Sequence, residues 1–259
     1  MRERQKEKSK MKKMTKIAAL IMALLMVVTA FAGCTATDDE LTGTLIVGTN
    51  PEFPPFEFYG DDGEVDGFDI AMMKLIAEEL DMEFQLEIME FKSLIAAIES
   101  GQIDCSAAGM TVTDERKQSV NFSDSYYTAS QKVILNDGST IATLADLEGK
   151  KIGVQEGTTG DFLCDDIAGC ETIRFKKGVD AVLDLKNGNL DAVIIDSNPA
   201  AEFVKANEGI FIKEEIEFEP EYYAIAVSKD QPKLLEAINN AIKTLQENGK
   251  FDELIAKYI

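Results

Sequence analysis

Three polar side chains stand at positions where an α/β protein can bind a small ligand. Arg116 carries a planar guanidinium, which can hold a carboxylate through two parallel hydrogen bonds. Residues 157–160 read Gly-Thr-Thr-Gly at a strand-to-helix turn, where free backbone N–H groups favour an anion near Thr159. Asp196 ends the apolar run 192–195, and α/β sheets place ligands at the carboxyl ends of their strands. The sequence therefore offers one cationic and one anionic side chain to a ligand.

Two of these residues also have purely structural explanations. Arg116 can be a solvated helix charge beside Asp114 and Glu115. Asp196 can be the N-cap of a helix that starts at residues 197–199. The residue types alone leave both alternatives open.

Composition excludes several classes of function. The 259 residues suffice for one large or two modest domains, and an apolar fraction of 45% allows a real core. There are 47 acidic and 26 basic residues, and eight of the basic ones lie in residues 1–16, so the rest of the chain would repel a nucleic acid. Histidine is absent, which removes Ser-His-Asp and Cys-His catalysis and histidine metal ligands. We expect no cofactor, no metal and no nucleic-acid partner.

Residues 1–33 have the parts of a secretory signal peptide: a basic stretch, an apolar run and small residues before a cut. The apolar run 17–32 is shorter than the roughly 20 residues that a transmembrane helix needs, so export is favoured over a membrane-spanning anchor. Residues 31–34, Phe-Ala-Gly-Cys, resemble a bacterial lipobox, although Phe31 stands where leucine is usual. This resemblance implies that Cys34 carries a lipid such as palmitate and that residues 34–42 form a tether. The starting methionine, at position 1, 11 or 14, stays open.

The three remaining cysteines do not have the spacing of a zinc site. Cys105 lies in an apolar run and is expected to be a buried free thiol. Cys164 and Cys170 are close in sequence, and export would permit a disulfide between them. Whether they pair stays open.

Apolar periodicity predicts short strands that alternate with amphipathic helices. Strands are expected at residues 45–48, 84–88, 103–109 and 192–195, and helices at residues 69–80, 91–100, 234–245 and 252–258. Thr113 is expected to cap a further short helix. Such alternation is typical of an α/β fold with a largely parallel sheet.

An internal similarity divides the chain into two halves. Residues 41–47 resemble residues 147–153, and residues 98–104 resemble residues 185–191, in the same order. Any two αβ units produce some similarity of this kind, but two lobes of like design explain it better. The strand expected at residues 222–227 would return the chain to the first lobe, and the cleft between two lobes is a common ligand site.

Several ordered motifs resemble those of the solute-binding proteins of family 3, the extracytoplasmic amino-acid-binding proteins of ABC importers. The motifs are GTNPEFPPFEF at 48–58, GEVDGFDI at 63–70, GMTVTDERK at 109–117, NFSDSYY at 121–127, GTTG at 157–160 and DAVIID at 191–196. The resemblance covers residues 43–259. It implies a two-lobe periplasmic-binding-protein type II fold, in which each lobe is a mostly parallel sheet flanked by helices and the ligand lies between the lobes. Lobe 1 would contain residues 43–129 and 224–259, and lobe 2 residues 130–223, with crossings near 128–131 and 219–223.

The resemblance also implies roles for individual residues. Arg116 and Thr159 would bind the α-carboxylate of a free amino acid. Asp196 would bind its α-ammonium, together with the carbonyl of Gly109 and the hydroxyl of Thr111. A site that excludes water has to pair both charges, since an unpaired buried charge costs several kcal/mol.

The pocket for the ligand side chain is less well defined. Phe53 and Phe91 stand where aromatic walls flank the ligand, although each can be plain core. Asn50 replaces an aspartate common in binders of cationic or amide ligands, and Gln155 replaces a lysine of glutamine-binding members. These departures weaken lysine and arginine as ligands and favour a polar or neutral amino acid. Glu57 or Glu156 can still provide a carboxylate.

The resemblance therefore implies a lipid-anchored, extracytoplasmic, monomeric binding protein without catalytic activity. It would deliver an amino acid to the transmembrane subunits of an ABC permease by closing its lobes. The alternatives are the soluble ligand-binding component of a sensory system and a dehydratase-like enzyme on the same fold. The identities of the amino acid and of the permease are not fixed by the sequence.

Overall fold

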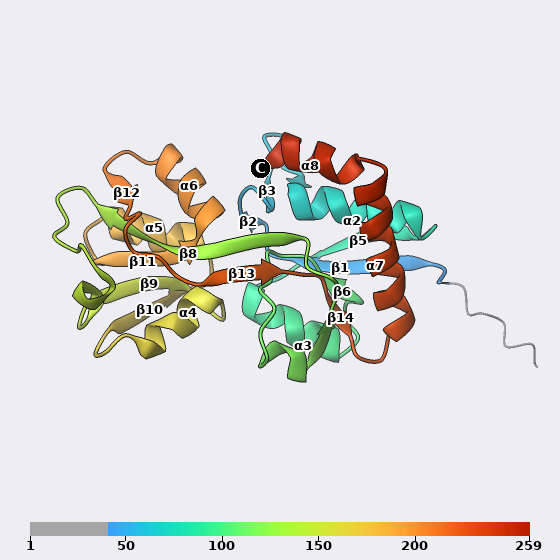
Figure 1. Cartoon of the computed structure of the whole chain (residues 1–259), viewed down its shortest axis with the longest axis horizontal. Helices are drawn as coiled ribbons and strands as arrows, with labels where there is room; N and C mark the ends of the chain where they lie inside the picture. The colour runs from blue at the N-terminus through green and yellow to red at the C-terminus, as the bar shows by residue number, and fades with distance from the viewer. Residues whose placement is uncertain (1–40) are drawn as a thin grey trace, which may run out of the picture. The chain divides into compact units, whose positions relative to one another are not determined.

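Residues 41–259, which the computed structural model describes, contain two separate large sheets and one small one (Figure 1). The predicted signal peptide, Cys34 and most of the predicted tether lie outside the described residues. The first sheet has the order β5–β1–β6–β14–β7, and the second has the order β10–β9–β11–β8–β12, with β13 paired to β8. We call the first sheet with its helices lobe 1, and the second with its helices lobe 2.

Lobe 1 has three parallel strands, β5, β1 and β6, joined to the antiparallel strands β14 and β7. The strands are β1 (Thr44–Thr49), β5 (Glu83–Ile88), β6 (Cys105–Ser106), β7 (Val120–Phe122) and β14 (Ala226–Ser228). The helices are α2 (Phe68–Glu79), α3 (Leu94–Glu99), α7 (Pro232–Glu247) and α8 (Lys250–Tyr258). A small antiparallel sheet of β2 (Glu52–Phe53), β3 (Glu57–Tyr59) and β4 (Val65–Asp66) belongs to the same part of the chain.

Lobe 2 repeats the plan, with β10, β9 and β11 parallel and β8 and β12 antiparallel. Its strands are β8 (Tyr127–Asn136), β9 (Lys151–Gln155), β10 (Glu171–Phe175), β11 (Ala192–Asp196), β12 (Ile210–Ile212) and β13 (Pro220–Tyr223). Its helices are α4 (Thr159–Leu163), α5 (Gly178–Lys186) and α6 (Ser197–Ala206). All five residues of β11 are buried, as expected for a central strand whose two faces are both covered.

The predicted helical periodicity of residues 69–80 is confirmed by α2. Its buried residues include Ile70, Met73 and Ile76, which lie three to four positions apart and form the face that packs on the sheet. α2 begins directly after Gly67, the residue that joins β4 to the helix. This start places Asp69 in the first turn, where it is completely buried.

Two strands, β8 and β13, connect the lobes. β8 and β13 pair antiparallel, with Tyr127 opposite Tyr223 and Ser130 opposite Pro220. Figure 1 shows this ribbon running from one sheet to the other. The residue limits proposed for each lobe remain a prediction, but the two strands lie where the crossings are expected.

Some predicted elements differ in extent. The strand expected at 103–109 is only Cys105–Ser106, because the backbone N–H of Gly109 donates to the carboxylate of Asp69 instead of to a neighbouring strand. The strand expected at 222–227 is split into β13 and β14. Thr113 does cap a turn, since its hydroxyl accepts from the backbone N–H of Arg116, but the turn is a 3-10 helix.

The three described cysteines are free thiols. Cys105 is buried, as expected. Cys164 and Cys170 do not pair, and the thiol of Cys170 lies 3.1 Å from the carbonyl oxygen of Cys164. Within residues 41–259, every helix is too short or too polar to cross a bilayer.

Gly67 provides a test of the packing around α2. Its φ of +127° is unfavourable for other residues, and a Cβ there would lie 2.2 Å from the carbonyl oxygen of Phe56. Gly63 also has a positive φ, +83°, but a Cβ there would meet no atom within 4 Å. We expect Gly63→Ala to cost about 1–2 kcal/mol of unfolding free energy, from backbone strain alone. Gly67→Ala should cost at least about 2 kcal/mol more in urea titrations, because the backbone must move. Equal losses would contradict this packing.

Candidate functional site

A small cavity lies between the two lobes, at the ends of their strands. All nine residues predicted to form the site line this cavity, together with Glu57, Ala108 and Thr158; the nine are Asn50, Phe53, Phe91, Gly109, Thr111, Arg116, Gln155, Thr159 and Asp196. The structure thus brings together positions more than 140 residues apart. The ligand contacts assigned to them remain predictions.

Arg116 is buried and connects the lobes. Its guanidinium donates to the carbonyl oxygen of Thr111 at 2.6 Å and to that of Gly157, in the loop before α4, at 2.9 Å. The side chain also packs over the ring of Phe91, 5.3 Å from its centroid. The explanation as a solvated helix charge is wrong, because Arg116 is 6% exposed and the exposed ion pair of this turn is made by Lys117 and Asp114.

The positive charge of Arg116 is not paired with an acid. Among residues 41–259, no carboxylate lies within ion-pair distance of its guanidinium. Burial lowers the pKa of Arg116, while the more distant charges of Glu221 and Asp196 raise it. A buried cation that faces a cavity without a counter-charge favours an anionic group in that cavity.

Asp196 lines the cavity from lobe 2, at the end of β11. It stands at the N-cap position of α6, but its side chain makes no capping hydrogen bond. Instead, its carboxylate accepts from the hydroxyl of Tyr223 at 2.5 Å. Burial, followed by the charge of Glu221, raises the pKa of Asp196 to about 7. The carboxylate is therefore poised to ionise fully when a cation enters.

Glu221, on β13, is a residue that the sequence analysis missed. One of its carboxylate oxygens accepts from the hydroxyl of Thr111 at 2.6 Å and from that of Thr159 at 2.7 Å. The side-chain amide of Gln131 donates to the same oxygen at 3.3 Å. Glu221 therefore links both lobes and adds a second negative charge beside Asp196.

The lobes are closed on one another in this structure. The amide of Gln155 donates to the side-chain oxygen of Asn50 at 2.9 Å, across the cavity. At the rim, Lys92 lies 2.8 Å from Glu156, and two further ion pairs join Lys176 to Glu90 and Lys177 to Glu52. These rim pairs are partly exposed, so each contributes little to closure.

Two glycines and the turn before α4 shape the cavity. Gly109 has φ of +54°, and a Cβ there would lie 2.7 Å from the ring of Phe53. Because Gly109 has no side chain, the ring of Phe53 can lie against its backbone, and this ring lines the cavity. Gly157 has φ of +81°, and Thr158 caps α4 by accepting from the backbone N–H of Asp161 at 3.3 Å. The first-turn N–H groups of α4, near Thr159, are left without helical partners.

Glu57, rather than Glu156, is the further carboxyl group of the cavity. Glu57 is 1% exposed and lines the cavity wall, whereas Glu156 pairs with Lys92 at the rim. Burial, and then the charge of Asp69, raises the pKa of Glu57 well above its usual range. The described residues contain no cluster of three or more metal-ligating side chains.

Comparison with known proteins agrees with this geometry. The sequence profile of "Bacterial extracellular solute-binding proteins, family 3" matches residues 45–259. A second profile, of a protein of unknown function, matches residues 4–34. The chain is 34% identical over 218 residues to a "Probable histidine-binding protein" of Neisseria gonorrhoeae, with 82% of this chain and 81% of the relative covered. It is 35% identical over 219 residues to the "Arginine-binding extracellular protein ArtP" of Bacillus subtilis (strain 168), with 83% and 85% covered.

Solved structures show the same fold. An ancestral arginine-binding protein bound to arginine has 40% identity and a TM-score of 0.80, with 84% of this chain and 98% of the other covered. An ancestral arginine-binding protein bound to glutamine has 40% identity and a TM-score of 0.81, with 85% and 99% covered. Membership of one protein family therefore explains both the two-lobe α/β architecture and the sequence motifs. The chain belongs to family 3 of the bacterial extracellular solute-binding proteins, which are binding proteins and not enzymes.

Proposed function

We propose that this protein binds a free amino acid outside the cell membrane and delivers it to an ABC importer by closing its lobes. The observation that carries the proposal is the buried guanidinium of Arg116, which has no acidic partner within ion-pair distance among residues 41–259 and lines the same cavity as the carboxylate of Asp196. An α-amino acid presents a carboxylate and an ammonium on one carbon and so complements both charges. The names of the relatives, which include arginine-, histidine- and cystine-binding proteins, support the same ligand class.

The α-carboxylate is placed against Arg116 and the start of α4. Two of the guanidinium's N–H groups already bond to Thr111 and Gly157, which fixes the plane of the side chain. The remaining donors, with the N–H groups near Thr159, complement a carboxylate. The α-ammonium is placed against Asp196, with Glu221 and the carbonyl of Gly109 as further acceptors.

The side chain of the ligand is best matched by a cationic amino acid, with arginine first. After a zwitterion has paired with Arg116 and Asp196, Glu57 remains as a buried acid in the cavity wall, and one of its oxygens has no hydrogen-bond partner among residues 41–259. A guanidinium or ammonium would supply that partner. This proposal departs from the expectation of a polar or neutral ligand, which was drawn from Asn50 and Gln155 alone.

A neutral polar ligand such as glutamine is the second candidate. The side-chain amides of Asn50 and Gln155 bond to each other across the cavity and can equally bond to a ligand amide. An arginine-binding protein similar to this chain has also been solved with glutamine bound. A thermal-shift screen against the common amino acids tests both candidates. A ligand at 100 times its Kd should add about 2.7 kcal/mol of stability, and a flat response to every amino acid would overturn the proposed function.

The cellular location follows from the N-terminal residues and the family. We infer that residues 1–33 are removed as a signal peptide and that Cys34 anchors the protein by a lipid to the outer face of the membrane. The acidic body, with a net charge of −21 for the whole chain, suits a monomer that docks only transiently on permease subunits.

Arg116→Ala should weaken amino-acid binding by about 3–5 kcal/mol, since the ligand carboxylate would stay buried without its partner. Calorimetry with L-arginine measures this loss. Lys117→Ala is the matched control, because Lys117 is the neighbouring cation but is exposed and pairs with Asp114. An Arg116→Ala affinity close to that of Lys117→Ala would remove Arg116 from the site.

Cys34→Ala should release the protein from the membrane, because a lipid on Cys34 is the proposed anchor. Fractionation of cells followed by a salt wash measures the distribution. Cys170→Ala, which changes a thiol of the folded body, should leave the protein in the membrane fraction. If Cys34→Ala also stays there after the wash, the lipid anchor is wrong.

A further inference from the structure

Glu57 is a buried acid with an unusual environment. It begins β3, is 1% exposed and lines the ligand cavity. Its Oε2 atom has no hydrogen-bond partner among residues 41–259, and no cation of that part lies within ion-pair distance of it. An ionised Glu57 carboxylate that is buried and unpaired would cost several kcal/mol. The Glu57 carboxyl group is therefore either protonated or paired with a cation.

Asp69, in the first turn of α2, is the acid next to Glu57. Unlike Glu57, it accepts hydrogen bonds from well-placed donors. Its Oδ2 atom accepts from the backbone N–H of Gly109 at 2.8 Å and from the hydroxyl of Tyr126 at 2.6 Å. Its Oδ1 atom, like Oε2 of Glu57, has no hydrogen-bond partner within the described part of the chain. Donors stabilise the charged form of a carboxyl group, so Asp69 is the member of the pair that ionises first.

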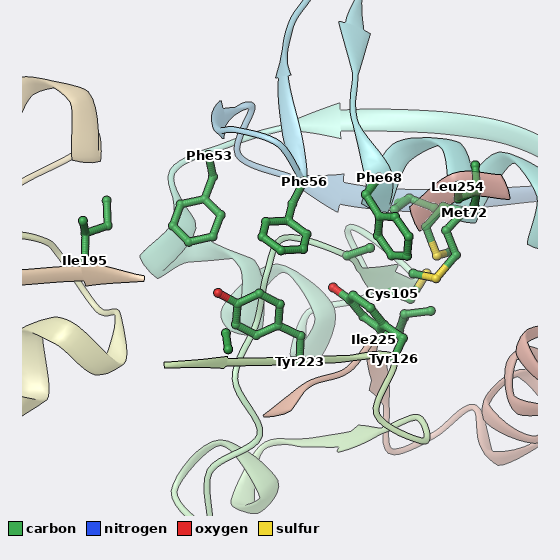
Figure 2. Close-up of a cluster of buried hydrophobic side chains, with 14 of the residues drawn as sticks. Phe53, Phe56, Phe68, Met72, Cys105, Tyr126, Ile195, Tyr223, Ile225 and Leu254 are labelled. Atoms are coloured by element: carbon green, nitrogen blue, oxygen red, sulfur yellow. The ribbon is translucent and has the colours of Figure 1, made fainter. Parts of the chain in front are cut away.

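The charged groups around Glu57 and Asp69 are mostly acids. Tyr126 and Tyr223 stand opposite Phe56 and Phe68 in the aromatic cluster of Figure 2, and Glu57 and Asp69 are both buried. The charged and titratable groups around the cavity are Asp196 on β11, Glu221 and Tyr223 on β13, Tyr126 before β8 and Arg116 on the 3-10 turn. Arg116 is the only cation among them.

The pKa values of the pair shift in the same sense. Burial, then the charge of Asp69, raises the pKa of Glu57 well above its usual range. Burial raises the pKa of Asp69 to about 6, although its hydrogen bonds with Tyr126 and Gly109 oppose the shift. Two adjacent carboxyl groups in one apolar site cannot both ionise easily.

We propose that Glu57 and Asp69 hold one proton between them while the cavity is empty or contains a neutral side chain, and that a cationic ligand side chain displaces this proton. This inference rests on the proposed function. In the exchange, the O–H bond of the Glu57 carboxyl group breaks, the proton passes to water, and the carboxylate pairs with the ligand cation. A neutral ligand instead meets a neutral carboxyl group, which can donate a hydrogen bond to it or to Asp69.

The proposal explains how one pocket can accept both cationic and neutral side chains. Binding of a cation lowers the pKa of the pair, so the bound state holds fewer protons than the free state. Affinity for a cationic amino acid therefore increases with pH, by about tenfold per pH unit while one proton is released. A neutral amino acid does not displace the proton, so its affinity should not show this increase with pH.

Calorimetry in two buffers of different ionisation enthalpy counts the protons released. L-arginine is compared with L-citrulline, its neutral isostere, at pH 7. Proton release caused by the α-ammonium at Asp196 is common to both ligands and cancels in the comparison. We expect arginine to release about one proton more than citrulline, and an equal count would overturn the proposal.

Infrared spectroscopy gives a readout that does not depend on the affinity of a variant. At pH 7 the ligand-free protein should show the C=O stretch of protonated carboxyl groups, to which Asp196 also contributes, and Glu57→Gln should remove the component that belongs to Glu57. Glu64→Gln, which changes an exposed acid after the same small strand, should leave it unchanged. L-arginine should remove the Glu57 component from the unaltered protein, whereas L-citrulline should leave that component in place and remove only the part that comes from Asp196.

Two results overturn the proposal. One is a ligand-free spectrum that Glu57→Gln leaves unchanged, and the other is arginine binding with no loss of the component that belongs to Glu57. Failure of the proposed function would look different, because no amino acid would then bind to the unaltered protein in either buffer.

Discussion

The arrangement of the site depends on a desolvated guanidinium. Arg116 comes from lobe 1, yet one of its two backbone acceptors is Gly157 of lobe 2, so a single charged group spans the closed cleft. The free energy of burying that charge is recovered only when an anion pairs with it. The same logic applies to lobe 2, from which Asp196 and Glu221 present carboxylates that a cation can pair with. A zwitterion satisfies both needs at once, and this is why its binding can favour the closed state over the open one.

The fold brings these opposite charges to one place by repeating one design. In each lobe, parallel strands end at the cleft, and the residues that follow them line it: Asn50 follows β1, Gly109 follows β6, and Thr159 follows β9. The crossing strand β13 adds Glu221 and Tyr223, which touch side chains of both lobes. The strands that join the lobes therefore also form part of the site, so opening of the lobes would separate the groups that bind the ligand.

Much of this could be predicted from the sequence, because the signals are local. The apolar stripe of α2, the buried strand before Asp196 and the turn at residues 157–160 each reflect short-range periodicity or turn chemistry. Glu221 could not be found in this way, since its partners Thr111 and Thr159 are 110 and 62 residues away. The closeness of Glu57 to Asp69, 12 residues along the chain, was missed for a different reason. Asp69 resembles an ordinary first-turn helix acid, and only the three-dimensional packing buries it completely.

The central claim is that the ligand's carboxylate, held by Arg116, draws the two lobes together. Small-angle X-ray scattering with L-arginine and with agmatine tests it most directly, because agmatine keeps the ammonium and guanidinium but lacks the carboxylate. The account predicts that saturating L-arginine reduces the radius of gyration and that agmatine at the same concentration does not. An equal reduction with both compounds, or no reduction with bound arginine, would contradict it.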